Sequence, residues 1–226
     1  MNRTAGFTLI ELAISLAIMA LLLGMLMVPL NTQLDQQRIN ETQKQLSLLS
    51  ESLLGFSVAN GRLPCPATPS LANTAANAGT ENKPGAACAL SEGVAPWATL
   101  AMPELDAWGR RFTYRVTPAF ADDPAGGMQS SFSLTDNGNL TITSAGAGVT
   151  IAANVVAVLV SHGKNGSGAY LPQGARMALG AGDELENADG DNTFVAKVPD
   201  PGFDDLVVWI SSNVLKSRMV AANRLP

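Results

Sequence analysis

The run from Leu12 to Leu34 constrains this chain most, because none of its 23 positions carries a charged side chain. As a helix, the apolar segment from Phe7 to Leu30 would be about 36 Å long, enough for the roughly 30 Å hydrocarbon core of a bilayer. Its apolar residues lie on every side of such a helix, which excludes an amphipathic surface helix. A secretory signal peptide would have a shorter apolar core and a small-residue cleavage site. We therefore predict a transmembrane helix over residues 7–30.

Glu11 does not fit a simple membrane anchor. Its carboxylate lies near the start of the apolar run, where a charge costs about 2.5–3.5 kcal/mol to insert and usually has a function and a partner. Arg3 precedes the run, and the positive-inside rule then predicts a cytoplasmic N-terminus.

The six residues Gly6-Phe7-Thr8-Leu9-Ile10-Glu11, followed by an apolar helix, resemble the class III signal of type IV prepilins and type II secretion pseudopilins. The resemblance implies that prepilin peptidase removes a leader, residues 1–6, by cutting between Gly6 and Phe7, and then N-methylates Phe7. It implies a single-pass inner-membrane protein with a periplasmic head. The partners of this protein would be other pilin or pseudopilin subunits. Glu11 would pair with the N-terminal amine of a neighbouring subunit, an attraction that is large in a low-dielectric surrounding.

The fold that this resemblance implies is α+β and pilin-like, with a long N-terminal helix packed on an antiparallel β-sheet. Residues 31–56 are expected to continue the helix as an amphipathic segment, and residues 57–226 to form the periplasmic head. Leucine and isoleucine recur at helical steps in the continuation, at Leu34, Ile39, Leu46, Leu49 and Leu53. Pro29 is expected to kink the helix or to melt one turn of it.

A loop-like segment, residues 60–96, follows and contains five prolines. Cys65 and Cys88 flank most of it and should pair in an oxidising periplasm, where the closed loop is worth about 3 kcal/mol. The alternative is two buried free thiols. Many type IV pilins have their disulfide near the C-terminus, so this position argues against a major pilin.

Further along, the pattern predicts about four or five strands. Alternation over residues 111–116 predicts a strand, after an Asp106-Ala-Trp-Gly turn that partly resembles a segment of major pseudopilins. Residues 132–142 are expected to form a hairpin around Asn137-Gly138. The apolar runs 155–160 and 206–210 predict two buried strands.

Composition excludes several functions. The chain is 46% hydrophobic and 15% charged with a net charge of −5, so neither disorder nor nucleic-acid binding is expected. The single histidine, His162, excludes a multi-histidine metal site. Its glycine-rich surroundings, residues 161–168, match neither a Walker A loop nor a nucleophile elbow. We predict no enzymatic activity.

An acidic stretch near the C-terminus is the candidate for a metal site. Asn187, Asp189 and Asp191 offer oxygen ligands at alternate positions, which suits calcium. The stretch is no EF-hand, because its glycine is misplaced and Val198 stands where the bidentate glutamate would be. Resemblance to major pseudopilins, which bind calcium in a late loop, favours a structural calcium ion. The alternative is a solvated acidic loop, and no other cofactor is expected.

Together these features predict a structural subunit of a type IV pilus or type II secretion pseudopilus, in a minor or tip position. The alternative is a membrane-tethered periplasmic binding or adhesion module that does not polymerise.

Overall fold

The structure, a computed structural model, describes residues 8–124 and 126–225, except for the side chains of residues 23–31. The chain divides into two units, Met1–Asn40 and Glu41–Pro226. Helix α1, Leu9–Asn60, begins in the first unit and ends in the second. The predicted leader, residues 1–6, and the predicted methylation site, Phe7, lie outside the described residues.

The first unit contributes the N-terminal part of α1. The backbone is helical through Pro29, so the alternative of a melted turn there is wrong. Large apolar side chains from Leu9 to Leu22 are 53–88% exposed. Within the described residues, no helix is both long enough and apolar enough to cross a membrane. The transmembrane segment predicted over 7–30 also includes Phe7 and the side chains of residues 23–30, which lie outside the described residues.

In the second unit, α1 buries one stripe of side chains in the head. The stripe consists of Thr42, Leu46, Leu49, Leu53 and Ser57, each at most 2% exposed, at the three- and four-residue steps of a helix face. Three of the leucines predicted to form the amphipathic stripe therefore do so. The helix ends at Asn60, four residues beyond the predicted boundary of 56.

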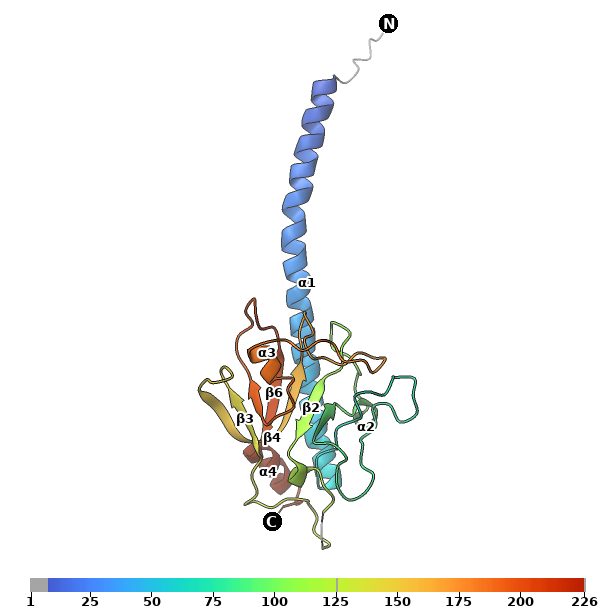
Figure 1. Cartoon of the computed structure of the whole chain (residues 1–226), viewed down its shortest axis with the longest axis vertical. Helices are drawn as coiled ribbons and strands as arrows, with labels where there is room; N and C mark the ends of the chain where they lie inside the picture. The colour runs from blue at the N-terminus through green and yellow to red at the C-terminus, as the bar shows by residue number, and fades with distance from the viewer. Residues whose placement is uncertain (1–7, 125, 226) are drawn as a thin grey trace. The chain divides into compact units, whose positions relative to one another are not determined.

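The head contains a curled, mixed sheet, six-stranded over the described residues. Its strands are β1 (Glu92–Val94), β2 (Thr113–Val116), β3 (Leu140–Thr143), β4 (Thr150–Ser161), β5 (Thr193–Val195) and β6 (Leu206–Ser211). The order is β1-β2-β4-β3-β5, with β6 also paired to β4. Figure 1 labels β2, β3, β4 and β6. Strands β3 and β5 pair in parallel, whereas the other pairs in the described head are antiparallel. The α+β layout is thus confirmed, but the expectation of a purely antiparallel sheet is wrong, because the chain passes through β4 and α3 (Asp183–Glu186) before it returns beside β3.

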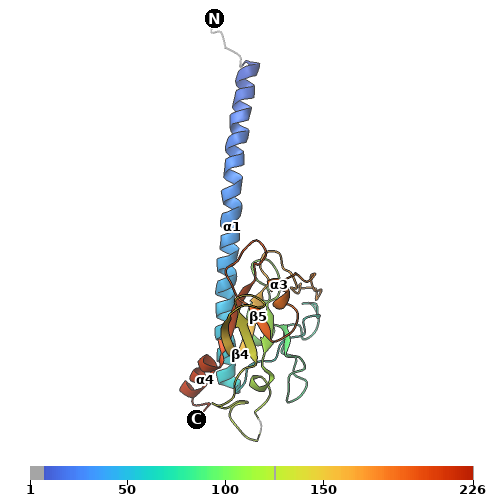
Figure 2. The same cartoon turned by 60° about the vertical axis from the view of Figure 1, so that its left-hand side comes forward.

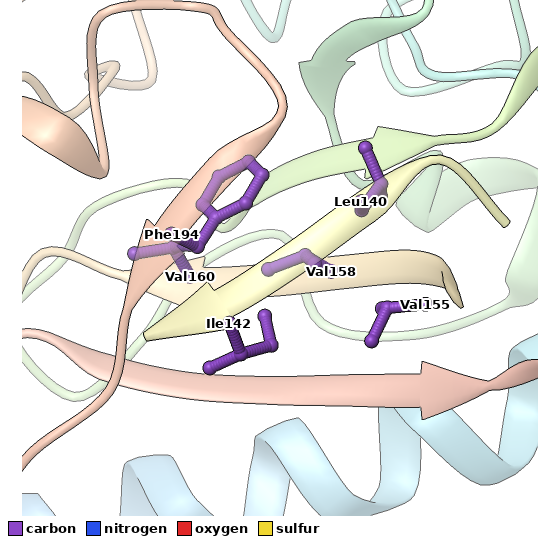
Figure 3. Close-up of a cluster of buried hydrophobic side chains, with 6 residues drawn as sticks. All are labelled: Leu140, Ile142, Val155, Val158, Val160 and Phe194. Atoms are coloured by element: carbon purple, nitrogen blue, oxygen red, sulfur yellow. The ribbon is translucent and has the colours of Figure 1, made fainter. Parts of the chain in front are cut away.

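Strand β4 is the centre of the sheet, as its continuous apolar run predicted. Residues 155–161 of this strand are at most 1% exposed, and β2 and β6 pair with this part of the strand. Figure 3 shows one side of the resulting core, a cluster formed by Leu140, Ile142, Val155, Val158, Val160 and Phe194. The part of α1 in this unit lies alongside the sheet (Figure 2), where Gln43 and Leu46 line a pocket together with residues 206–208 of β6.

The predicted hairpin over residues 132–142 is wrong. Only β3 forms there, and it pairs with β4 and β5. The Asp136 carboxylate accepts hydrogen bonds from the backbone N–H and the hydroxyl of Ser133 at 2.7 and 2.9 Å, which closes a turn where the first strand was expected. Gly138 lies against the backbone of Val155, and a Cβ at this position would overlap the Val155 carbonyl. The glycine therefore permits close packing on β4 instead of a hairpin turn.

The C-terminal segment closes the head. Helix α4, Ser212–Ala221, is capped by Ser211, whose hydroxyl accepts a hydrogen bond from the N–H of Val214. Beyond it, the Arg224 guanidinium donates to the carbonyl oxygens of Val58 and Ala59 at 2.9 and 2.8 Å. These carbonyls are in the last turn of α1, so Arg224 satisfies acceptors that the helix itself leaves free.

Candidate functional site

The long loop after α1 is held at several points. The predicted disulfide between Cys65 and Cys88 is present, with a Cα–Cα distance of 5.3 Å. Arg62 forms an ion pair with Glu81 at 2.8 Å, and the buried hydroxyl of Tyr114 donates to the carbonyl of Pro64. Strand β1 lies inside the segment that was predicted to be loop. An extended loop of this length is unusual in a compact domain, and these cross-links explain how it is ordered.

The three predicted calcium ligands lie in different surroundings. Asn187 is 1% exposed, and its side chain bonds to Val195 and Asp205. Asp189 and Asp191 are exposed. Their side chains accept hydrogen bonds from the N–H groups of Asp191 and Thr193 at 3.1 and 2.6 Å, which are Asx turns.

A different set of acidic side chains comes together in the head. Ligand atoms of Glu184, Asp204 and Asp205 all lie within 4.8 Å of one another. Glu184 belongs to α3, and the two aspartates directly precede β6. The sequence pattern did not identify these three residues as a ligand set, because twenty positions separate the glutamate from the first aspartate.

The acidic cluster, defined as Glu184, Asp204 and Asp205, has features that fit a hard cation. The Oδ1 atoms of Asp204 and Asp205 are buried, and neither has a hydrogen-bond partner among the described residues. Burial raises the pKa of Asp204, and the negative charges of Glu184 and Asp205 raise it further. Unpaired carboxylate oxygens are costly to bury, and carboxylates are the oxygen ligands that calcium prefers.

His162 packs against this cluster from inside the head. It is fully buried, with Nε2 2.9 Å from the Thr113 hydroxyl and Nδ1 3.7 Å from Oδ1 of Asp205. The order hydroxyl, imidazole and carboxylate resembles a catalytic triad, but Thr113, His162 and Asp205 are each at most 5% exposed. A substrate has no access to such a hydroxyl, so these groups support packing and not catalysis.

Thr8 and Glu11 form a second candidate site at the start of α1. The Glu11 Oε2 atom accepts hydrogen bonds from the N–H and the hydroxyl of Thr8 at 2.9 and 2.8 Å. In return, the N–H of Glu11 donates to the Thr8 hydroxyl at 3.3 Å. This reciprocal pattern is a capping box, with Thr8 as N-cap. The Thr-x-x-Glu spacing in the sequence is its known signal, and the sequence analysis did not use it.

Comparison with known proteins identifies this segment. A family model, the prokaryotic N-terminal methylation motif, matches residues 1–27. The chain carries the class III signal of type IV pilins and pseudopilins. This signal supports prepilin-type processing and methylation, and it spans the predicted positions Gly6, Phe7 and Glu11. No curated protein and no solved structure matches the chain.

The capping box of Thr8 and Glu11 lies within the class III signal, so what is known of proteins with this signal bears on its role. Proteins with this signal are structural subunits that prepilin peptidase processes and that assemble with other pilin subunits. Glu11 is exposed and bonded within its own chain, while exposed apolar side chains follow it along α1. The signal also indicates a membrane-anchored, fibre-associated protein.

Proposed function

We propose that this chain is a minor or tip subunit of a type IV pilus or a type II secretion pseudopilus. Prepilin peptidase would cut between Gly6 and Phe7 and methylate the new amine of Phe7. The mature chain would be a single-pass inner-membrane protein, with its N-terminus cytoplasmic and its head periplasmic, until it joins a fibre. The methylation motif over residues 1–27 carries this proposal.

The contacts of Glu11 support a role in assembly. In the single chain its carboxylate caps α1 through Thr8, which within residues 8–124 and 126–225 is an uncharged, local partner. In a bundle of α1 helices, the amine of a neighbouring Phe7 would offer this carboxylate a cation in a medium of low dielectric constant. An unpaired carboxylate in that medium is penalised, so the pair would fix the axial register of neighbouring subunits.

The primary test is the intact mass and N-terminal sequence of the membrane-extracted protein, with and without the peptidase. We expect a chain that begins at N-methylated Phe7 only when the peptidase is present. A chain that retains residues 1–6 in peptidase-positive cells would contradict the proposal and favour the alternative, a membrane-tethered binding or adhesion module.

A second test separates assembly from helix capping. Glutamine also completes a capping box, so Glu11→Gln removes the charge and retains the helix start. We expect Glu11→Gln to insert into the membrane normally and to be absent from sheared fibres. Glu41, an exposed glutamate of the same helix, provides the control, and Glu41→Gln should assemble. Equal recovery of both variants in fibres would contradict a role for the Glu11 charge.

We further propose that the head binds a cation of the calcium type through the acidic cluster. The unpaired oxygens of Asp204 and Asp205 support this ligand set, and a bound cation would offset the repulsion between the three carboxylates. Calorimetric titration with calcium chloride tests the site, and Asp205→Asn should abolish the binding heat. The ligand set predicted from the sequence, Asn187, Asp189 and Asp191, is tested in parallel with the variant Asp189→Asn. If the acidic cluster holds the cation, this variant should bind calcium with the same affinity as the unchanged chain.

A further inference from the structure

We propose that Asn187 is a positioning residue, which holds Asp205 in place for the cation and couples the cation site to the edge of the sheet. This inference rests on the cation site proposed above. It assigns to Asn187 a role different from the direct ligation that the sequence pattern predicted.

The Asn187 side chain serves as a strand partner for Val195. Its Oδ1 atom accepts a hydrogen bond from the N–H of Val195 at 2.8 Å, and its Nδ2 atom donates to the Val195 carbonyl at 3.1 Å. Strand β5 is last in the strand order and pairs through β3 on its other side. The carboxamide therefore satisfies both backbone groups of Val195 on the outer edge, where an edge strand has unpaired groups.

The second proton on Nδ2 of Asn187 connects this edge to the acidic cluster. It is donated to the Oδ2 atom of Asp205 at 2.8 Å. With Oδ2 held in this way, the carboxylate of Asp205 has a fixed orientation, and its Oδ1 atom is left without a hydrogen bond among the described residues. Hydrogen bonds of this kind orient carboxylates that ligate a metal, and their loss typically weakens metal affinity about 10- to 100-fold.

The chemistry of this position requires an amide. Both protons of Nδ2 are used, one by the Val195 carbonyl and one by Asp205, while Oδ1 accepts. An aspartate would place a carboxylate against the carbonyl oxygen of Val195 and against a second carboxylate. The arrangement predicts that cation binding at Asp205 restrains Asn187, and that Asn187 in turn protects the amide of Val195 from exchange.

Asn165 provides a matched comparison, because it bonds to the other two carboxylates of the cluster. Its Nδ2 atom donates to Oε1 of Glu184 at 2.5 Å, and its backbone N–H donates to Asp204 at 2.9 Å. Asn165 thus also orients a carboxylate of the cluster, but among the described residues no hydrogen bond joins it to β5. A variant at Asn165 should affect the cation and spare the edge strand.

The experiment uses the full chain in detergent, with calcium affinity from calorimetry and amide exchange at Val195 with calcium or with EDTA. In the unchanged chain, calcium should slow exchange at Val195 several-fold. Asn187→Ala should weaken calcium binding about 10- to 100-fold, and exchange at Val195 should become fast with or without calcium. Asn165→Ala should weaken binding similarly and keep the slow exchange at Val195 once calcium is saturating.

The outcomes separate the two proposals. If the unchanged chain binds no calcium, the cation site fails and the coupling fails with it. If Asp205→Asn abolishes binding but Asn187→Ala leaves the affinity unchanged, the cation site stands and the role of Asn187 is refuted. If Asn187→Ala does not fold, the coupling is tested by amide exchange in the unchanged chain. Equal exchange rates at Val195 with calcium and with EDTA would refute the coupling.

Discussion

Replacement of Arg111 by methionine tests how the head orders its long loop. The Arg111 side chain is fully buried. Its guanidinium pairs with Glu104 at 2.9 Å, donates to the carbonyls of Pro69, Leu71 and Pro172 at 2.7–2.9 Å, and lies 4.6 Å from the centre of the Trp97 ring. One side chain, two residues before β2, therefore joins three segments that have no regular structure of their own.

The expected loss follows from what methionine would leave behind. It fills similar volume, but the Glu104 carboxylate, which is 18% exposed, loses its cation, and three carbonyls lose a donor. Removing one partner of a buried ion pair costs about 3–5 kcal/mol. In a chain of this size, 1 kcal/mol shifts Tm by about 2–4 °C, so Arg111→Met should lower Tm by about 10 °C.

Thermal unfolding followed by near-UV circular dichroism measures this loss, since the nearby Trp97 reports on the packing. The control is Arg218→Met, because Arg218 pairs with Glu51 on the surface, where the two side chains are 56% and 61% exposed. An exposed pair of this kind is worth less than about 1 kcal/mol. Equal shifts of Tm for the two variants would refute the reasoning, since burial would then have no effect on the strength of the pair.

Three further predictions concern the same head. Replacing Cys65 and Cys88 together by serine should lower the free energy of unfolding by about 3 kcal/mol, as measured in urea, and an unchanged midpoint would contradict this. Gly138→Ala should cost about 1–3 kcal/mol or more by overpacking, measured in the same assay. Burial alone would raise the pKa of Glu81, but its hydrogen bonds from Arg62 and from the N–H of Cys65 lower it overall. Its stabilisation is therefore present above the unfolded-state pKa and lost as pH falls through the folded-state pKa, so Glu81→Gln should flatten the acid side of the stability profile.

The elements that the sequence predicted well are those with a strong local pattern. The apolar run 155–160 became the buried part of β4, where a strand buried on both sides needs no alternation, and the run 206–210 became β6, whose middle residues are half-buried. The stripe on α1 was predictable because helical periodicity places Leu46, Leu49 and Leu53 on one face. The disulfide between Cys65 and Cys88 was predictable because the chain contains two cysteines and the resemblance to prepilins predicted an oxidising surrounding for them.

The elements that the sequence did not predict depend on partners far along the chain. Strands β1 and β5 are three residues long, too short for a period to be recognised. The Asn137-Gly138 pair has the usual signal of a hairpin turn, but the close approach of Gly138 to β4 determines its role. In each case a contact across the sheet overrides the local preference.

The acidic stretch shows why ligand sets are difficult to read from spacing. Oxygen side chains at alternate positions suit a calcium loop, but they equally suit consecutive Asx turns, and Asp189 and Asp191 form such turns. What distinguishes the two is which carboxylate oxygens remain without a donor after folding. The answer depends on the position of Asp205 relative to Glu184. The sheet determines this position, because Leu206, the neighbour of Asp205, begins β6.

Asn187 was identified as important because of its oxygen, but its two amide protons are what connect Val195 to Asp205. A search of a sequence for metal sites should therefore consider amide donors beside the acidic residues as well as the acidic residues themselves, because those donors determine which oxygen is left for the ion.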